Sequence, residues 1–138
     1  MLVQFETRIE TEGRGFYPLT AFVCRTVEES PVTRGLCTLF VHHTSASLLI
    51  CENADPDVRR DLEAFFSRWV PDGDPCYTHT AEGPDDMPAH IRSVLTQTSL
   101  SVPIVDGRCG LGTWQGLYLW EHRHAPGRRL ITLTLMGE

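Results

Sequence analysis

The chain has 138 residues, 41% apolar and 22% charged, which is the composition of one ordinary globular domain with a real core. Its formal net charge of −6 argues against a nucleic-acid-binding surface, because neutralising phosphates requires clustered cations. All 12 basic residues are arginine, which excludes both a Schiff-base lysine and the lysine of a Walker-type phosphate loop.

The N-terminal segment 1–10 alternates polar and apolar residues, which predicts a strand over residues 2–10. This segment lacks the basic and apolar stretches of a signal peptide. No run in the chain approaches the ~20 apolar residues of a membrane-spanning helix. We therefore expect a cytoplasmic protein with neither membrane nor nucleic-acid partners.

Helical and extended patterns alternate in the next part of the chain. After a glycine-containing turn at 13–15, apolar residues at helical spacing predict a helix over 19–27, with Pro18 in its first turn. Two extended stretches follow, over 36–43 and 47–52, separated by a polar kink.

Two further helices are predicted from their start signals. Asp55 is an N-cap candidate, the proline after it suits the first helical position, and residues 71–74 end this helix. A polar loop follows. Asp85 or Asp86 is then expected to cap a helix that ends near residue 97.

The C-terminal part of the chain reads as strands over 99–105, 113–123 and 129–136, the first two joined by the glycine-rich turn 106–112. The order of elements predicts an α+β fold. We expect a single compact domain over 1–138, built on a largely antiparallel β-sheet or sandwich with about three helices.

Five cysteines, an odd number without C-x-x-C spacing, fit neither a disulfide framework nor a structural zinc site. Three of them lie among apolar neighbours and are expected to be small buried hydrophobic residues: Cys24, Cys37 and Cys51. A nucleophilic role for Cys76 or Cys109 stays open.

Four of the six histidines lie in three short polar segments at the ends of predicted elements, within 42–47, 85–90 and 112–122. Imidazoles gathered from separate elements bind transition metals or move protons near neutral pH. Each of these histidines also has a purely structural explanation. For His90 it is a solvent-exposed interaction with Asp86, four residues earlier on the same face of a helix. The same carboxylate can instead orient the ring for metal binding.

The strand predicted over 113–123 carries apolar residues on both faces and is expected to be buried in a sheet or a subunit interface. Gln115 and Glu121 would share one face of it, and His122 would lie on the other. A buried polar group without a partner costs about 1–3 kcal/mol, so these side chains need partners. A structural hydrogen-bond network explains them as well as a catalytic role does.

Three groups of sequence segments, read in order, match one family pattern. They are VHHTSAS at 41–47 with ENADP at 52–56, EGPDDMPAHI at 82–91, and GTWQGLYL at 112–119 with EHR at 121–123. With them the chain resembles the YjbQ-type family, which is named for a secondary thiamine-phosphate synthase activity. Two departures are visible: Cys51 stands where the family usually has asparagine, and Trp120 where it has glycine.

The resemblance implies a homotrimer with sites at or near subunit boundaries and a metal-binding histidine cluster. The matched ligand positions are His43, His90 and His122, with His79 as a fourth or substitute ligand. Three neutral imidazoles with an open position suit a divalent metal, with zinc as the expected ion. Magnesium can accompany a diphosphate substrate.

The implied activity joins a hydroxymethylpyrimidine diphosphate to a thiazole phosphate and releases pyrophosphate. Such a reaction requires two substrates held in register and stabilisation of the leaving group's charge. The residues predicted for catalysis are Asp86, Glu82, Thr44 and Ser45. Those predicted to bind substrate are Trp114, Gln115, Arg108 and Asn53.

Two other functions remain open at this stage. A three-histidine metal site can generate metal-bound hydroxide, so a metal-dependent phosphatase or hydrolase of a small phosphorylated substrate is the enzymatic alternative. The non-enzymatic alternative is a trimer that binds a metal or a small ligand.

Overall fold

The computed structural model describes residues 1–138. In chain order its elements are β1 (Leu2–Thr11), β2 (Gly15–Pro18), α1 (Thr20–Glu29), β3 (Gly35–Val41), β4 (Ala46–Glu52), α2 (Pro56–Trp69), α3 (Asp86–Leu95), β5 (Ser99–Val105), β6 (Arg108–Cys109), β7 (Gln115–Glu121) and β8 (Gly127–Gly137).

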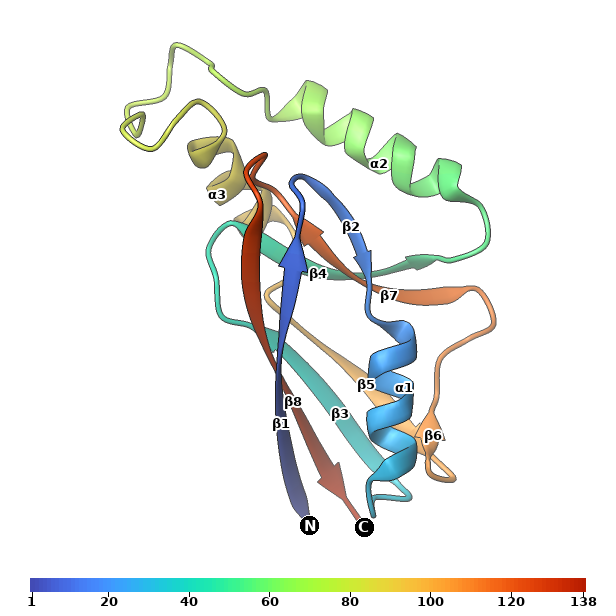
Figure 1. Cartoon of the computed structure of the whole chain (residues 1–138). Helices are drawn as coiled ribbons and strands as arrows, with labels where there is room; N and C mark the ends of the chain where they lie inside the picture. Colours follow the sequence, from blue (N-terminus) through green and yellow to red (C-terminus); the bar gives the residue numbers. More distant parts are fainter.

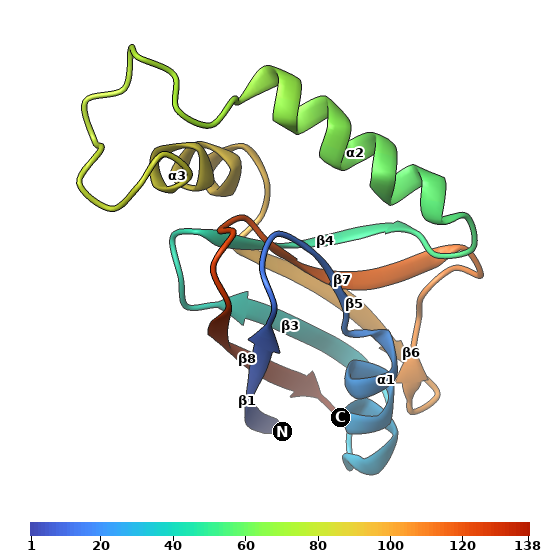
Figure 2. The same ribbon diagram turned by 45° about the horizontal axis from the view of Figure 1, so that its top comes forward.

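The strands form two antiparallel sheets that pack as a sandwich (Figure 1). The larger sheet has the order β1-β8-β3-β5-β6 and the smaller one β2-β7-β4. Figure 2 shows that α2 and α3 lie over the smaller sheet, while α1 lies beside the lower end of the sandwich. The single α+β domain with a mostly antiparallel sheet and three helices is therefore confirmed.

The core lies between the two sheets and is closed at one end by α1. Alternate residues of the strands point into it, as the period of two requires. From β7 these are Leu117 and Leu119, both fully buried, and α1 adds Val23 and Val27. Burying one such aliphatic side chain contributes about 1.5–3 kcal/mol, so these residues fix the register of β7 in the smaller sheet.

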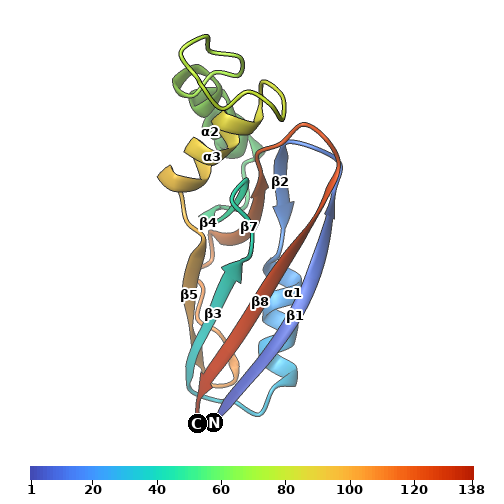
Figure 3. The ribbon, with the colours of Figure 1, turned by 90° about the vertical axis from the view of Figure 1, so that its left-hand side faces the viewer.

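The outer face of the larger sheet carries no helix, and Figure 3 shows β1, β8, β3 and β5 side by side there. Leu36 and Phe40 of β3 lie on this face with 44% and 45% of their surface exposed. Met136 of β8 pairs with Leu36 and is 55% exposed. This face is therefore a candidate contact surface for another copy of the chain.

Two short strands were not expected from the sequence. Residues 15–18 form β2 and pair with β7, so Pro18 ends a strand and the helix begins only at Thr20. Proline is tolerated there because β2 is an edge strand. Within the glycine-rich turn, Arg108 and Cys109 pair with the end of β5 as β6.

The helix starts differ in how they are capped. Asp55 accepts a hydrogen bond from the Asp57 amide at 2.9 Å and caps α2 as the sequence predicts. Asp85 occupies the N-cap position of α3, but its side chain makes no cap hydrogen bond. Its carboxylate instead accepts from Arg123 and from the His124 amide. Asp85 therefore lies at the predicted start of α3, but neither Asp85 nor Asp86 caps the helix with its side chain.

No helix has both the length and the apolar surface required to cross a bilayer. The five cysteines are free, and Cys37 is the fully buried one among them. Burial raises the pKa of the Cys37 thiol to about 11, and burial together with Cys24 raises that of Cys109 to about 12. Neither thiol is therefore primed as a nucleophile.

Candidate functional site

Two histidines and one aspartate meet above the edge of the smaller sheet. The Nε2 atoms of His79 and His90 both hydrogen-bond the same oxygen of Asp86, Oδ2, at 2.7 and 3.1 Å. One ligand-type atom from each residue lies within 4.8 Å of the other two. The two rings are 5.3 Å apart and steeply inclined, at 71°. This arrangement is the candidate site of the protein.

Local geometry explains two members of the site and the loop before α3 supplies the third. Asp86 and His90 are separated by one helical turn on α3, so they share a face. His79 comes from the segment 70–85, which Arg14 ties to the turn between β1 and β2 through two hydrogen bonds to Asp72.

Arg123 holds the site against β7. Its guanidinium donates to Asp86 Oδ1 at 2.6 Å, to Asp85 Oδ2 at 3.1 Å and to the Glu82 carbonyl at 2.9 Å. Burial alone would raise the pKa of the Asp86 carboxyl, but the His79 hydrogen bond and the charge of Arg123 lower it below its usual value. Asp86 is therefore ionised at neutral pH.

The donor set fits a divalent cation of the zinc class. Two imidazoles and one carboxylate make a three-residue set that leaves a further position for water or substrate. In a tetrahedral site with zinc bonds, neighbouring ligand atoms lie roughly 3.3–3.5 Å apart. Asp86 Oδ2 lies 2.7 and 3.1 Å from the two Nε2 atoms, so each nitrogen would move less than about 1 Å from this oxygen to reach that spacing. The ionised Asp86, with 3% exposure, supplies the negative charge that such an ion requires.

Of the three histidines predicted as metal ligands, only His90 belongs to this group, and His79 takes part as the substitute considered from the sequence. His43 uses Nε2 to accept a hydrogen bond from the Leu130 amide at 2.8 Å. His43 and His90 nevertheless line one shared cavity of about 200 Å³. His43 therefore lies beside the group without belonging to it.

His122 is fully buried and lies outside the group. Its Nε2 shares a 2.8 Å hydrogen bond with Ser47 Oγ, and its Nδ1 has no partner. Its ring is 5.0 Å from that of Trp120. Burial, with the charges of Arg92 and Arg14, lowers the pKa of His122 to about 2. Within one chain His122 is a neutral core residue.

Glu121 has the partners that its burial requires. Its carboxylate accepts hydrogen bonds from Thr11, from two nitrogens of Arg129 and from two backbone amides. Burial would raise the pKa of Glu121, but Arg129 and Thr11 lower it. Arg129 also donates to Ser45 Oγ at 2.9 Å, which joins the predicted catalytic residue Ser45 to this network.

The remaining predicted catalytic residues lie near the group. Thr44 lines the same cavity as His43 and His90. Glu82 lies in the loop before α3, where its carbonyl, rather than its side chain, contacts Arg123.

The four predicted substrate-binding residues lie elsewhere in the same chain. Trp114 and Gln115 stand at the opposite end of β7 from Glu121, and Asn53 bonds the carbonyl of Thr113 there. A seven-residue strand spans about 20 Å. Gln115 receives a hydrogen bond from Gly112 and so closes its own turn. Arg108 lies on β6, at the far end of the molecule from α3 (Figure 1).

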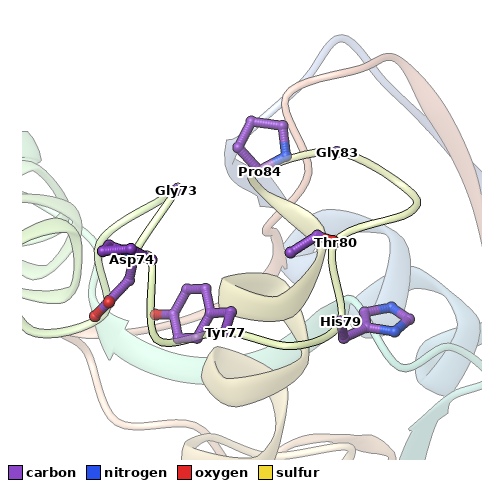
Figure 4. Close-up of a pocket in the computed structure, with 8 residues that line it drawn as sticks. Gly73, Asp74, Tyr77, His79, Thr80, Gly83 and Pro84 are labelled. Atoms are coloured by element: carbon purple, nitrogen blue, oxygen red, sulfur yellow. The ribbon is translucent and has the colours of Figure 1, made fainter.

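A cavity of about 350 Å³ adjoins the group, inside the loop that leads to α3. Figure 4 shows the loop curling around it, with Thr80 pointing inward, Tyr77 beside the cavity and the His79 ring turned outward. His79 therefore belongs to the cavity wall and to the group of ligand atoms at the same time. The His79 ring, which carries the ligand atom, faces away from the cavity, so the cavity and the group share only this residue.

A family profile described as "UPF0047 protein YjbQ-like" matches residues 5–138. The chain belongs to this family. A UPF0047 protein of Synechocystis is 54% identical over 94% of this chain and 88% of its own length. The YjbQ protein of Escherichia coli O157:H7 is 46% identical over the whole of both chains.

Solved structures show the same UPF0047 fold. A Clostridium acetobutylicum protein of the YjbQ/UPF0047 family superimposes with a TM-score of 0.83 at 33% identity, over 97% of this chain and 99% of that one. A YbjQ-like protein of unknown function from Sulfolobus solfataricus gives 0.87 over the whole of both chains, and at 21% identity it shows the fold alone.

The two departures from the YjbQ-type pattern fall at different places. Trp120 lies beside His122, with the two rings tilted by 54°, and donates from Nε1 to Glu63, so it fills the space between β7 and α2. Cys51 pairs with Gly116, two residues from the Trp114 end of β7. Within one chain, then, neither departure changes the group of His79, Asp86 and His90.

Sequence reasoning did not identify Arg129 as part of the site. The sequence shows two consecutive arginines, Arg128 and Arg129, at the start of the last strand. The partner of Arg129 is Glu121, which lies on a strand of the other sheet. Only the sandwich brings the two together.

Proposed function

We propose that the protein is a metal-dependent enzyme acting on a small phosphorylated substrate, with the metal held by His79, Asp86 and His90. The single observation that carries this proposal is the convergence of two imidazoles on one buried, ionised carboxylate oxygen. Zinc is the first ion to test, and magnesium is the second because it accompanies diphosphates.

The leading reaction is the synthase reaction: a hydroxymethylpyrimidine diphosphate is joined to a thiazole phosphate. The carbon–oxygen bond to the diphosphate breaks, the thiazole nitrogen bonds to the freed carbon, and pyrophosphate leaves with the electron pair. A bound metal would stabilise the charge on the leaving diphosphate. Arg123, Thr44 and Ser45 lie around the group and suit contacts to phosphate oxygens.

Hydrolysis is the second candidate reaction, and the partial exposure of both histidines favours it. The side chains of His79 and His90 are 47% and 33% exposed, which leaves room for water on a metal bound between them. Metal-bound water loses a proton near neutral pH and attacks phosphate esters.

We also propose that the working form is a homotrimer. The uncovered face of the larger sheet, with Leu36, Phe40 and Met136, supports a contact between copies. Trp114 and Gln115 lie about 20 Å along β7 from Glu121, so they would reach a substrate at the group only from another subunit.

Metal analysis of protein purified without chelator tests the proposal. About one divalent ion per chain is expected, and His79→Ala, His90→Ala and Asp86→Asn should each lose it. The matched control is His42→Ala, an exposed histidine that bonds Thr132 on the larger sheet and should keep the metal. Absence of metal after incubation with zinc or magnesium would refute the site.

Turnover assays then separate the reactions. The synthase requires both substrates and yields pyrophosphate, the hydrolase consumes one substrate and yields phosphate, and a binding protein shows neither. Activity that survives the loss of metal in His90→Ala would contradict the proposed role of the metal.

A further inference from the structure

A second cavity, of about 240 Å³, has Arg123 in its wall. Three of its eight lining residues carry the argument: Ser45, Arg123 and Arg129. Three arginines and one carboxylate, Glu121, line this cavity. Its volume is below the ~300–1,000 Å³ of cavities that enclose whole ligands, so it fits a small group at the end of a substrate.

Several N–H and O–H groups at this cavity have no acceptor within the chain. Arg129 uses Nε and Nη2 for Glu121 and Ser45, which leaves Nη1. Arg128, the preceding residue of β8, points to the opposite face of the sheet and pairs there with Glu10. The Ser45 hydroxyl accepts from Arg129, and its own proton is left to donate. These unused donors are suited to an acceptor-rich anion.

The one carboxylate at the cavity is already neutralised. Glu121 is fully buried, and five hydrogen bonds converge on its two oxygens, two of them from Arg129. A side chain at position 127 would crowd the ion pair of Glu121 and Arg129, since a Cβ on Gly127 would lie 3.2 Å from Glu121 Oε1. The glycine thus leaves the cavity open above the ion pair.

We propose that this cavity is a phosphoryl-binding subsite, in which Ser45 and Arg129 hold the terminal phosphate of the substrate. Guanidinium groups bind phosphate oxygens through paired hydrogen bonds, and arginine is the only strongly basic side chain that this protein contains. The inference rests on the proposed function, because it names which part of the substrate binds outside the metal group.

Arg123 connects the subsite to the metal group. It lines the cavity and also donates to Asp86 Oδ1, while the other oxygen of Asp86 binds the two histidines. A phosphate in the cavity and a metal at the group would therefore both lie close to Arg123. That arrangement suits a diphosphate or a phosphomonoester whose reacting bond faces the metal.

The test measures binding of inorganic pyrophosphate and inorganic phosphate by calorimetry to the full chain, in buffer with chelator so that the metal makes no contribution. Saturable binding is expected, and Ser45→Ala should weaken it about tenfold, as loss of a charge-assisted contact does. The Ser45 side chain lies at the cavity wall, so the fold should persist. Arg34→Ala is the matched control, since Arg34 is exposed and paired with one carboxylate at the other end of the molecule.

The outcomes separate this subsite from the metal proposal. Pyrophosphate binding that is unchanged in His90→Ala but weakened in Ser45→Ala supports the subsite even if no metal is found. Absence of binding in the parent protein, or equal weakening by Arg34→Ala and Ser45→Ala, overturns the subsite even if the metal is present. Weakening by His90→Ala alone would overturn it too, because the anion would then bind at the histidines.

Discussion

The buried His122 predicts a loss of stability as the pH falls. Burial and the neighbouring guanidinium groups lower its pKa from 6.5 to about 2 in the folded chain. In the unfolded chain a histidine titrates near pH ~6.5, so between these two values only the unfolded chain binds the proton. The free energy of unfolding should then fall by about 1.4 kcal/mol per pH unit, or about 2 kcal/mol between pH 6.5 and 5.

Urea unfolding at a fixed protein concentration, with chelator, measures this slope between pH 7.5 and 5. The comparison is a double variant, Ser47→Ala with His122→Phe, which removes both partners of a buried hydrogen bond. Its slope should be shallower by about 1.4 kcal/mol per pH unit below pH ~6.5. His43, whose pKa is lowered by burial and by Arg129, leaves a residual slope of the same sign.

A parent protein that is equally stable at pH 6.5 and 5 would refute the reasoning. So would parallel curves for the parent and the double variant. The carboxylates with lowered pKa values, such as Asp86, lose their stabilising charge only at lower pH, below this window.

Three further predictions concern charge and surface. Glu63→Ala should lower the free energy of unfolding in urea by about 3 kcal/mol, because it leaves the fully buried Arg92 without its carboxylate. The control Asp57→Ala breaks an exposed ion pair and should lower it by less than about 1 kcal/mol. Equal losses in the two variants would contradict the argument. Asp86→Asn should lower metal affinity by at least tenfold in competition with a chromogenic chelator, since the ligand oxygen loses its charge. Phe40→Glu should convert a trimer into monomers in light scattering, and an unchanged mass would exclude that face as the contact.

Local sequence patterns determined much of the fold. The Asp55 cap, the burial of β7 on both faces and the pairing of Asp86 with His90 were all predicted, because each depends on residues a few positions apart. The two short strands β2 and β6 were missed. Each is at most four residues long and exists because a longer strand lies beside it to pair with.

The candidate site could be predicted only in part. The sequence showed that histidines gather at the ends of elements, and it identified Asp86 and His90 as partners. It did not show that a loop folds His79 onto the same oxygen, or that Trp114 stands a whole strand away from Glu121.

The sequence by itself determined which chemistry this protein can carry: arginine as its only strong base, histidines beside carboxylates, and one α+β domain. The tertiary structure decided which of these groups meet. Arg123 reaches Asp86 across 37 residues and Arg129 reaches Glu121 between the two sheets. Such contacts follow from strand register and sheet packing, which depend on the burial of the whole core and on no single motif.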